Sequence, residues 1–378
     1  MDSTKNESNT EKVVKSRVLS IPGTKPNVQN AQLLISTGIP SLDLLIGGGL
    51  AVGTVMLIED DAYGCYGDVF LKYFLAEGVA SKQTLYVASK DIRTTKLVSE
   101  LPALINDEDI ENETKDKNKD IKMSIAWRYQ HLSTTEQKKL TFSHYYDLSK
   151  TMDQSFLKDT VIHHWDNEKL INNTPPNTFS NPIYHELLQD IKNVLKKFEF
   201  ETNAKPEKRT ILRVALHSLG SPFWIPIPPP NETIRPISRN RDLDMFMFCL
   251  KALMRSAYAV AVITVPTGMI TEDCMARCVH NVDTAIRLET FMGTPNEKNP
   301  ALSDYNGFLN LTKLPSINTV EQIQPASLDL AFKLRRKKFV IEKLHLPPEL
   351  AESRQREQDD STPSFGCGSF SKQSKLDF

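Results

Sequence analysis

A loop dense in carboxylates follows the first long apolar run of the sequence, and residues 59–68 read EDDAYGCYGD. Gly64 and Gly67 permit a tight turn, in which backbone N–H groups after a strand can surround an anion. A phosphate loop of the GxxxxGK[ST] type adds a Lys for the phosphate charge and a Ser or Thr hydroxyl for magnesium. This loop has neither, and acids such as Asp61 would repel phosphate. The loop therefore keeps the glycines of a phosphate-binding turn but lacks the lysine and the hydroxyl group that bind phosphate and magnesium.

Two later strand ends lack the expected groups as well. The apolar run 212–216 is followed by His217, where an ATPase places an aspartate that orients magnesium. Imidazole is a poor ligand for this hard, oxygen-seeking ion. In an ATPase with such a loop a catalytic carboxylate follows the strand that corresponds to 85–88, and here Asp91 is the only acid within reach. We therefore expect no catalytic residue in this chain, no cofactor bound by the chain alone and no autonomous ATP hydrolysis.

The elements that must position these residues alternate between strand and helix. A strand, a helix and a strand with short connections form a βαβ unit, which requires a parallel sheet covered by helices. Helices with an apolar face are expected at 69–78, 185–200, 243–256 and 274–280. Apolar runs predict buried strands at 54–59, 84–88, 209–217 and 258–265, and an edge strand at 338–344.

The front of this pattern resembles the RecA-like ATPase core. The resemblance rests on Ser-Thr-Gly at 36–38, the glycine run 47–49, Gly53, and the strand, loop and helix that follow. It implies an α/β fold, RecA-like, with a mainly parallel twisted sheet, helices on both faces, polar insertions and mobile tails. Hydrophobic patterning predicts a single RecA-like domain at 31–350 with a polar insert near 106–120. A disordered N-terminal tail at 1–30 and a flexible C-terminal tail at 351–378 are expected to flank it.

The composition excludes several classes of protein. The 378 residues include 46 Lys and Arg and 47 Asp and Glu, and this net charge of -1 argues against a uniformly basic nucleic-acid coat protein. A hydrophobic content of 40% allows a core and leaves length for unpacked segments. Five cysteines without a CxxC pair are typical of a reducing compartment. Residues 1–16 lack the apolar segment of a signal peptide, and no apolar run is long enough to cross a membrane.

Cys274 and Cys278 are the cysteines that could share a metal ion, because residues four apart lie on one face of a helix. A structural zinc site needs four ligands, and no second ligand pair lies at a suitable spacing. We therefore expect these thiols to serve helix packing, and we expect no metal site.

Two groups of basic residues are candidates for RNA contact. The first lies in an expected loop after the proline-rich connector 225–230 and comprises Arg235, Arg239 and Arg241. The second comprises Arg335, Arg336, Lys337 and Lys338. Such clusters contact phosphate backbones, but the second also fits a nuclear-localisation signal or an edge strand kept soluble by its charge. The sequence leaves these alternatives open.

Three further segments make the family resemblance more specific. WRY at 127–129, KLHLPPE at 343–349 and KLDF at 375–378 occur together with the degenerate loop, and the chain resembles the Elongator complex protein 4 family from about residue 20 onward. The resemblance implies a non-catalytic subunit that joins Elongator subunits five and six in a hetero-hexameric ring, within the whole Elongator complex. It implies tRNA binding by the ring, support for modification of wobble uridine at carbon 5, a place in cytoplasm and nucleus, and no membrane. It leaves open whether ATP binds at the ring interfaces.

Two other functional classes remain. A RecA-like NTPase subunit could have its nucleotide site completed by a neighbouring chain that supplies the missing cation. A small-molecule enzyme built on a doubly wound sheet is the third class, although no nucleophile-and-base pair stands out in the sequence. Recovery of a hexamer with two other RecA-like chains would favour the ring subunit, whereas a lone monomer with turnover would overturn it.

Overall fold

The computed structural model describes residues 21–61, 63–105, 142–165, 179–226, 236–319, 324–325 and 327–344, without the side chains of 236–240. The strands of the principal sheet are β4 (Val55–Asp60), β5 (Thr84–Ser89), β8 (Ile162–Trp165), β9 (Leu212–His217), β10 (Ala259–Pro266), β11 (Thr284–Thr290), β12 (Gly307–Lys313), β13 (Leu330–Leu334) and β14 (Phe339–Lys343). The longer helices are α2 (Gly67–Ala80), α7 (Pro182–Lys197), α8 (Pro236–Arg255) and α9 (Glu272–His280). The shorter elements are β1 (Thr24–Asn27), β2 (Gln32–Ile35), β3 (Leu50–Ala51), β6 (Pro102–Leu104), β7 (Tyr146–Thr151), α1 (Pro40–Leu45), α3 (Thr94–Ser99) and α6 (Gln154–Lys158).

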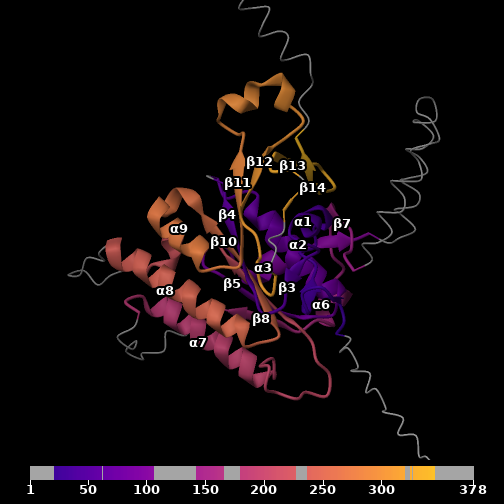
Figure 1. The fold of residues 1–378 in the computed structure, drawn as a ribbon, viewed down its shortest axis with the longest axis vertical. Helices are drawn as coiled ribbons and strands as arrows, with labels where there is room; N and C mark the ends of the chain where they lie inside the picture. The colour runs from indigo at the N-terminus through magenta and orange to yellow at the C-terminus, as the bar shows by residue number, and fades with distance from the viewer. Residues whose placement is uncertain are drawn as a thin grey trace, which may run out of the picture.

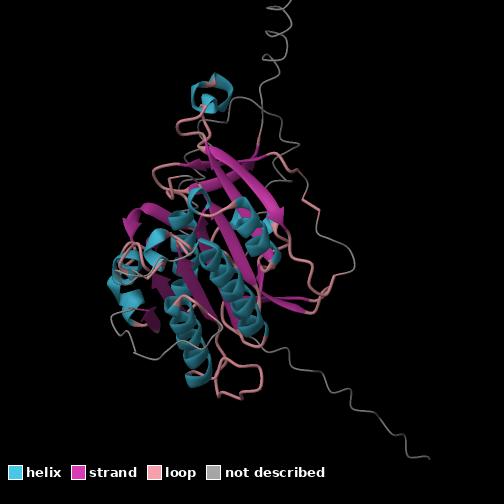
Figure 2. Ribbon diagram, turned by 90° about the vertical axis from the view of Figure 1, so that its left-hand side faces the viewer, coloured by secondary structure: helices cyan, strands magenta, loops and turns pink. Residues whose placement is uncertain are grey.

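The principal sheet has the order β14-β13-β12-β11-β4-β10-β9-β5-β8, and its strands form one twisted layer (Figure 2). From β11 to β8 every neighbouring pair is parallel. β12, β13 and β14 extend the sheet antiparallel and place β14 at its edge, near the top of Figure 1. The predicted mainly parallel RecA-like α/β fold is therefore confirmed, as is the predicted edge strand.

Alternate residues of the central strands face two separate hydrophobic cores, because successive side chains of a strand point to opposite faces. Met56 and Ile58 of β4 pack in the core that includes α2. Val55 and Leu57 of the same strand pack in the core that includes α7, α8 and α9. These strands are hydrophobic on both faces because helices cover both sides, as the sequence predicted.

The N-terminal boundary of the fold differs from the expectation. Residues 21–30 were expected to belong to a disordered tail, but β1 pairs with β2 in a small antiparallel sheet. Ile21 is buried, and Pro22 accepts a hydrogen bond at its carbonyl from the side chain of Gln83. The polar composition of this segment concealed the order, since a short edge strand needs few apolar residues.

Other expectations fall on parts of the chain that the structure does not describe. Residues 1–20, the polar insert at 106–120 and the C-terminal tail at 351–378 lie outside the described residues. The same holds for WRY at 127–129. Within the described part, no helix combines the length and hydrophobicity that crossing a membrane requires.

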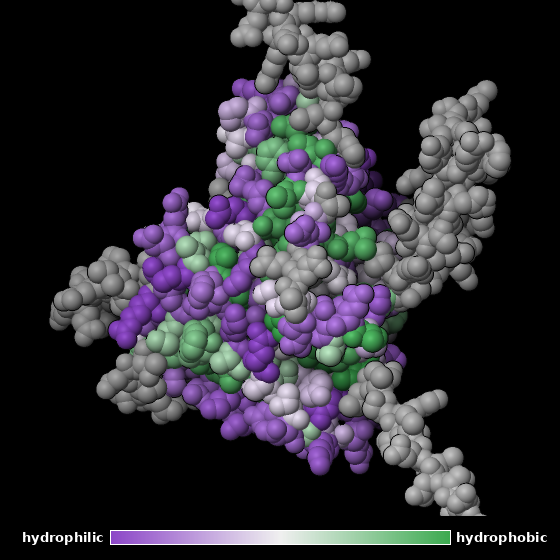
Figure 3. All heavy atoms as spheres, in the orientation of Figure 1, coloured by the Kyte–Doolittle hydropathy of each residue, from purple (hydrophilic) through white to green (hydrophobic). Residues whose placement is uncertain are grey.

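The surface in the view of Figure 3 is mostly hydrophilic, with hydrophobic side chains reaching it in several patches. Large apolar side chains exposed among the described residues include Tyr63, Phe248, Met269 and Met292. Scattered exposed apolar residues are normal, but a group of them beside a hollow marks a contact surface.

Candidate functional site

The degenerate loop lies at the carboxyl ends of the parallel strands, where open α/β sheets bind their ligands. β4 ends at Asp60, and α2 begins at Gly67. The end of β5 and the end of β9 meet in register, with Ser89 opposite His217. The structure therefore brings together the three strand ends that the sequence singled out.

The N–H groups of the loop are bound by the loop's own carboxylates. Asp61 Oδ1 accepts hydrogen bonds from the amides of Cys65 at 3.0 Å and Tyr66 at 3.4 Å. Asp60 Oδ1 accepts from the amides of Gly67 at 2.8 Å and Asp61 at 2.9 Å. In a phosphate loop such amides hold phosphate oxygens. Here two internal carboxylates occupy that position.

Glycine is required at position 64 and at position 67 for different physical reasons. Gly64 has a φ of +67°, so the predicted tight turn depends on it. At Gly67 the constraint is space, because an added Cβ would lie 2.4 Å from Asp60 Oδ2. The first helical position of α2 therefore has room for the Asp60 carboxylate only because it carries no side chain.

Burial and then its hydrogen bond to the neighbouring carboxylate raise the pKa of Asp60 to about 8. At neutral pH the Asp60 carboxyl is therefore mostly protonated. The side chains of Asp60 and Asp61 together face the loop N–H groups at the N-terminus of α2, where a helix dipole would favour an anion. A nucleotide phosphate would have to displace these two side chains.

His217 is engaged on both ring nitrogens. Its Nε2 lies 2.5 Å from Asp68 Oδ1, and its Nδ1 lies 2.8 Å from Ser89 Oγ. Asp68 is the second residue of α2, the place at which GxxxxGK[ST] puts the Ser or Thr that binds magnesium. A direct His–Asp contact thus joins two positions that magnesium would bridge in a nucleotide-binding relative.

The expectation that no nucleophile-and-base pair exists needs correction, because the fold places Ser89, His217 and Asp68 in contact. Sequence separation hid this set, and only the parallel register of β5 and β9 assembles it. Ser89 is buried, and its Oγ also accepts the amide of Ile92 at 3.1 Å. The serine oxygen is therefore hydrogen-bonded by the backbone on one side and by the imidazole on the other. These contacts give Ser89 a structural role in holding the loop and not the role of a nucleophile.

The remaining predicted positions have local partners. Asp91, the expected stand-in for a catalytic carboxylate, accepts a hydrogen bond from Ser221 Oγ at 2.5 Å. Lys72, the first lysine after the loop, pairs with Glu100 at 2.8 Å. Neither side chain is available to a phosphate group, because Asp91 is hydrogen-bonded to Ser221 and Lys72 is paired with Glu100.

Sequence reasoning missed a buried arginine and its hydrogen-bond partners. Arg213 of β9 is fully buried and donates to Gln83 and to the carbonyls of Ser36 and Phe74. Burial lowers its pKa to about 10, opposed by the charge of Glu77. An Arg inside an apolar strand run was the available signal, because a buried guanidinium must find partners.

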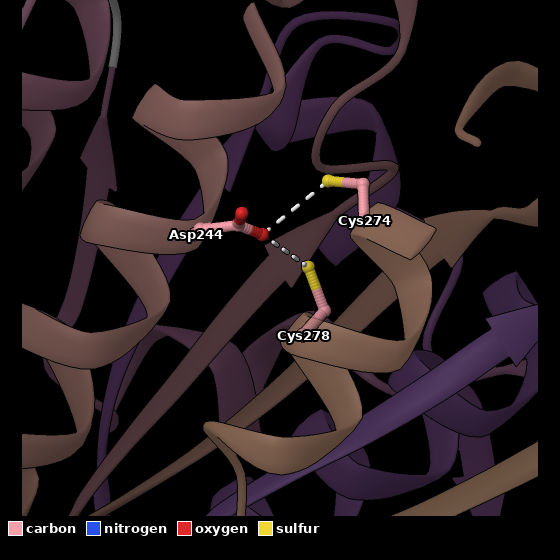
Figure 4. A group of neighbouring side chains, drawn as sticks. All are labelled: Asp244, Cys274 and Cys278. Carbon is pink, nitrogen blue, oxygen red and sulfur yellow. Dashed lines mark hydrogen bonds between the residues drawn. The ribbon is translucent and has the colours of Figure 1, made fainter. Parts of the chain in front are cut away.

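Asp244 joins the two cysteines that the sequence had left as a pair. It reaches from α8 toward α9, where Cys274 Sγ lies 3.4 Å and Cys278 Sγ 3.8 Å from its Oδ1 (Figure 4). Its Oδ2 accepts from Arg277 at 2.5 Å. These three ligand atoms lie within 4.8 Å of one another, so the reason given for expecting no metal was incomplete. The Asp244 carboxylate already accepts hydrogen bonds from the two thiols and from Arg277. A structural zinc site has four protein ligands, and this group offers three.

The structure separates the two candidate RNA-contacting groups. Arg335, Arg336, Lys337 and Lys338 are exposed at the turn between β13 and β14, on the edge hairpin. Arg241 is exposed on α8, and Arg239 lies in the same helix with a side chain outside the described part. Arg235 lies outside the described residues. The expectation of a loop at 235–241 was wrong from Pro236 onward, because α8 begins there.

Comparison with known proteins adds the decisive observation. Residues 17–378 match the family model described as PAXNEB protein. Elongator complex protein 4 of Danio rerio is 38% identical over 96% of this chain and 94% of that protein. The Homo sapiens protein of the same name is 39% identical over 89% of this chain and 82% of that protein. The chain belongs to the Elongator complex protein 4 family. The predicted family resemblance is thereby confirmed.

The family match covers the degenerate loop and both described basic groups. The Xenopus laevis Elongator complex protein 4 is 39% identical over 94% of this chain and 91% of that protein. Among solved structures, a KaiC-like protein of Pyrococcus horikoshii OT3 aligns with a TM-score of 0.41 and 15% identity, over 82% of this chain and 98% of that one. Membership of the Elongator complex protein 4 family thus rests on sequence relatives over nearly the whole chain.

Proposed function

We propose that this chain is a non-catalytic RecA-like subunit of the Elongator complex. In this proposal it assembles with Elongator subunits five and six into a hetero-hexameric ring that binds tRNA and supports modification of wobble uridine at carbon 5. Family membership supports the place in Elongator. The observation that carries the non-catalytic role is the filling of the phosphate-loop amides by Asp60 and Asp61.

The chemistry of the strand ends supports the same proposal. ATP hydrolysis needs a cation for the phosphates, a magnesium ligand and a group that orients water. At these positions the chain has Gly67, a His217–Asp68 contact, and Asp91 bonded to Ser221. The chain therefore retains the fold of the ATPase core while its polar groups satisfy one another.

The first experiment is to purify the full chain alone and with the fifth and sixth Elongator subunits. We expect a hexamer containing all three chains, and no ATP turnover by the isolated chain. A lone, monomeric chain with measurable turnover would overturn the proposal. Native mass spectrometry gives the subunit count, and phosphate release gives the turnover.

The second candidate function is an NTPase site completed by a neighbouring chain, with ATP at a ring interface. It is tested in the assembled ring by replacing Asp60 and Asp61 with asparagine. Loss of ring ATPase in this variant would favour the second function, because the degenerate loop would then contribute to the site. Unchanged ATPase assigns any turnover to the other subunits.

We also propose that the ring works in both cytoplasm and nucleus, where the basic turn at 335–338 could serve import as well as RNA contact. Tagged full-length chain should appear in both compartments. Reversal of charge at this turn separates the roles, since an import signal changes location and an RNA contact changes tRNA affinity.

A further inference from the structure

In the part of the chain that the structure describes, three side chains with metal-binding atoms meet where α8 packs against α9. Cys274 and Cys278 lie one turn apart on the buried face of α9, and Asp244 reaches them from α8 (Figure 4). Both cysteines are fully buried, whereas the Asp244 side chain is 17% exposed. The group therefore lies in a helix–helix junction, and its carboxylate is the side that solvent reaches.

The spacing of these atoms fits a tetrahedral metal ion. Asp244 Oδ1 lies 3.4 Å from Cys274 Sγ and 3.8 Å from Cys278 Sγ, and all three atoms lie within 4.8 Å of one another. Tetrahedral zinc with ordinary bond lengths separates a sulfur from an oxygen ligand by about 3.5 Å and two sulfurs by about 3.8 Å. Only small shifts of the side chains would therefore place all three atoms around one ion.

Arg277 orients the carboxylate and supplies a balancing charge. Its Nε donates a hydrogen bond to Asp244 Oδ2, so the other oxygen is the one that faces the two sulfurs. Carboxylate ligands of metal ions are commonly oriented by such a hydrogen-bond partner. Two thiolates and one carboxylate would bring three negative charges to a divalent cation. The guanidinium of Arg277 would neutralise the one negative charge that remains.

The ligand atoms select the kind of metal ion. Two thiolates favour zinc over magnesium and calcium, which prefer oxygen ligands. Three protein ligands leave the fourth position of zinc to a water molecule, as in zinc sites that are not closed structural ones. The Arg277 side chain, which pairs with the carboxylate, is 52% exposed. An ion and its water ligand can therefore approach from the carboxylate side.

We propose that Asp244, Cys274 and Cys278 bind one zinc ion per chain, with water as the fourth ligand. In the metal-free chain both thiols donate hydrogen bonds to the carboxylate. When zinc binds, each thiol releases its proton to solvent and its sulfur bonds to the ion, with no change of oxidation state. Because thiols are weak hydrogen-bond donors, the ion would hold α8 to α9 more firmly than they do. This site does not depend on the proposed ring function.

The test adds Zn²⁺ alone, or Co²⁺ alone as its spectroscopic substitute, to the reduced full-length chain. We expect one ion per chain, release of two protons, and a higher urea midpoint of unfolding, because a ligand of the folded state stabilises it. Bound cobalt should show the charge-transfer absorption of cobalt–thiolate bonds. Absence of this absorption in the folded wild-type chain would overturn the zinc site, whatever the variants show.

The variants then locate the ion. Cys274→Ser/Cys278→Ser should abolish the thiolate absorption and raise the Kd for zinc at least about a hundredfold, since losing even an outer partner of a metal ligand costs about 10–100-fold. Asp244→Asn should keep the absorption and raise the Kd at least about tenfold, because it removes the charged ligand but neither sulfur.

The matched control is Cys65→Ser/Cys249→Ser, which removes the same number of thiols outside the group. It should leave both the Kd and the absorption unchanged. Equal zinc binding by wild type and by Cys274→Ser/Cys278→Ser would assign the ion to other side chains and refute the proposal.

Discussion

At the scale of single residues, Asp60 accounts for much of the difference between this loop and a phosphate-binding loop. The side chain accepts hydrogen bonds from two backbone amides of the loop, and burial raises its pKa. Counting acidic residues in the sequence indicated that phosphate would be repelled. The structure adds that the amides themselves are already taken, so the site is filled as well as wrongly charged.

The raised pKa of Asp60 predicts a pH dependence of stability. The pKa of Asp60 is about 8 in the folded chain against an ordinary value of 3.8. Between these pH values the folded state binds more protons than the unfolded state, so the free energy of unfolding falls as pH rises from about 4 to about 8. Asp43, whose burial raises its pKa to about 6, adds the same sign between about 4 and 6.

Asp60→Asn should flatten the upper part of this dependence, because an asparagine amide imitates the protonated acid and donates toward Asp61. At pH 8.5 we expect the free energy of unfolding to rise by about 1–3 kcal/mol, with a smaller change at pH 5. Urea denaturation at the two pH values measures this. The exposed Asp159→Asn should show no such difference, and equal effects of Asp60→Asn at both pH values would contradict the raised pKa of Asp60.

At the scale of elements, the start of α2 depends on the end of β4. The helix can begin at Gly67 with the Asp60 carboxylate against its first turn because no Cβ is present there. This contact links two positions in one loop, so their substitutions should not be additive.

Gly67→Ala should lower the free energy of unfolding by about 1–3 kcal/mol, since its Cβ would overlap Asp60. In an Asp60→Ala background the same substitution should cost little, because the carboxylate has gone. A double-mutant cycle in urea measures the coupling. Gly268→Ala is the control, as its Cβ would meet nothing within 4 Å. The same cost in both backgrounds would show that the crowding is not with Asp60.

Helix α8 shows a limit of pattern reading at this scale. Its closely spaced apolar residues begin at Leu243, so the mainly polar stretch before them was expected to be a loop. The helix starts at Pro236, a residue that favours the first turn because its missing N–H needs no partner there. The helix therefore begins several residues before its closely spaced apolar residues, and hydrophobic periodicity marked only its later part.

At the scale of the whole molecule, the net charge of -1 averages over regions of opposite sign. A hollow beside the degenerate loop is lined by Glu59, Glu272 and Glu289, whereas the turn between β13 and β14 carries the basic residues 335–338. Acidic and basic side chains therefore gather on different elements of one nearly neutral chain.

Arg335→Glu/Arg336→Glu should lower the tRNA affinity of the assembled ring and reduce its salt slope by about 2 per chain, if both side chains contact phosphate. Lys205→Glu/Lys208→Glu reverses two exposed charges elsewhere and should have little effect. Binding is measured by fluorescence anisotropy over a salt series. Unchanged affinity and slope in the hairpin variant would assign its charges to keeping an edge strand soluble.

The sequence by itself determined the alternation of strands and helices, the RecA-like fold and the failure of the GxxxxGK[ST] loop, because these depend on periodicity and residue type along the chain. Only the tertiary structure decided what replaced the lost chemistry. The His217–Asp68 contact and the Asp244–Cys274–Cys278 group each bring together residues from different elements. Only the tertiary structure, likewise, leaves one buried Glu59 oxygen without a hydrogen bond from the residues it describes. The distances between these residues are set by strand register and helix packing, which no local pattern specifies.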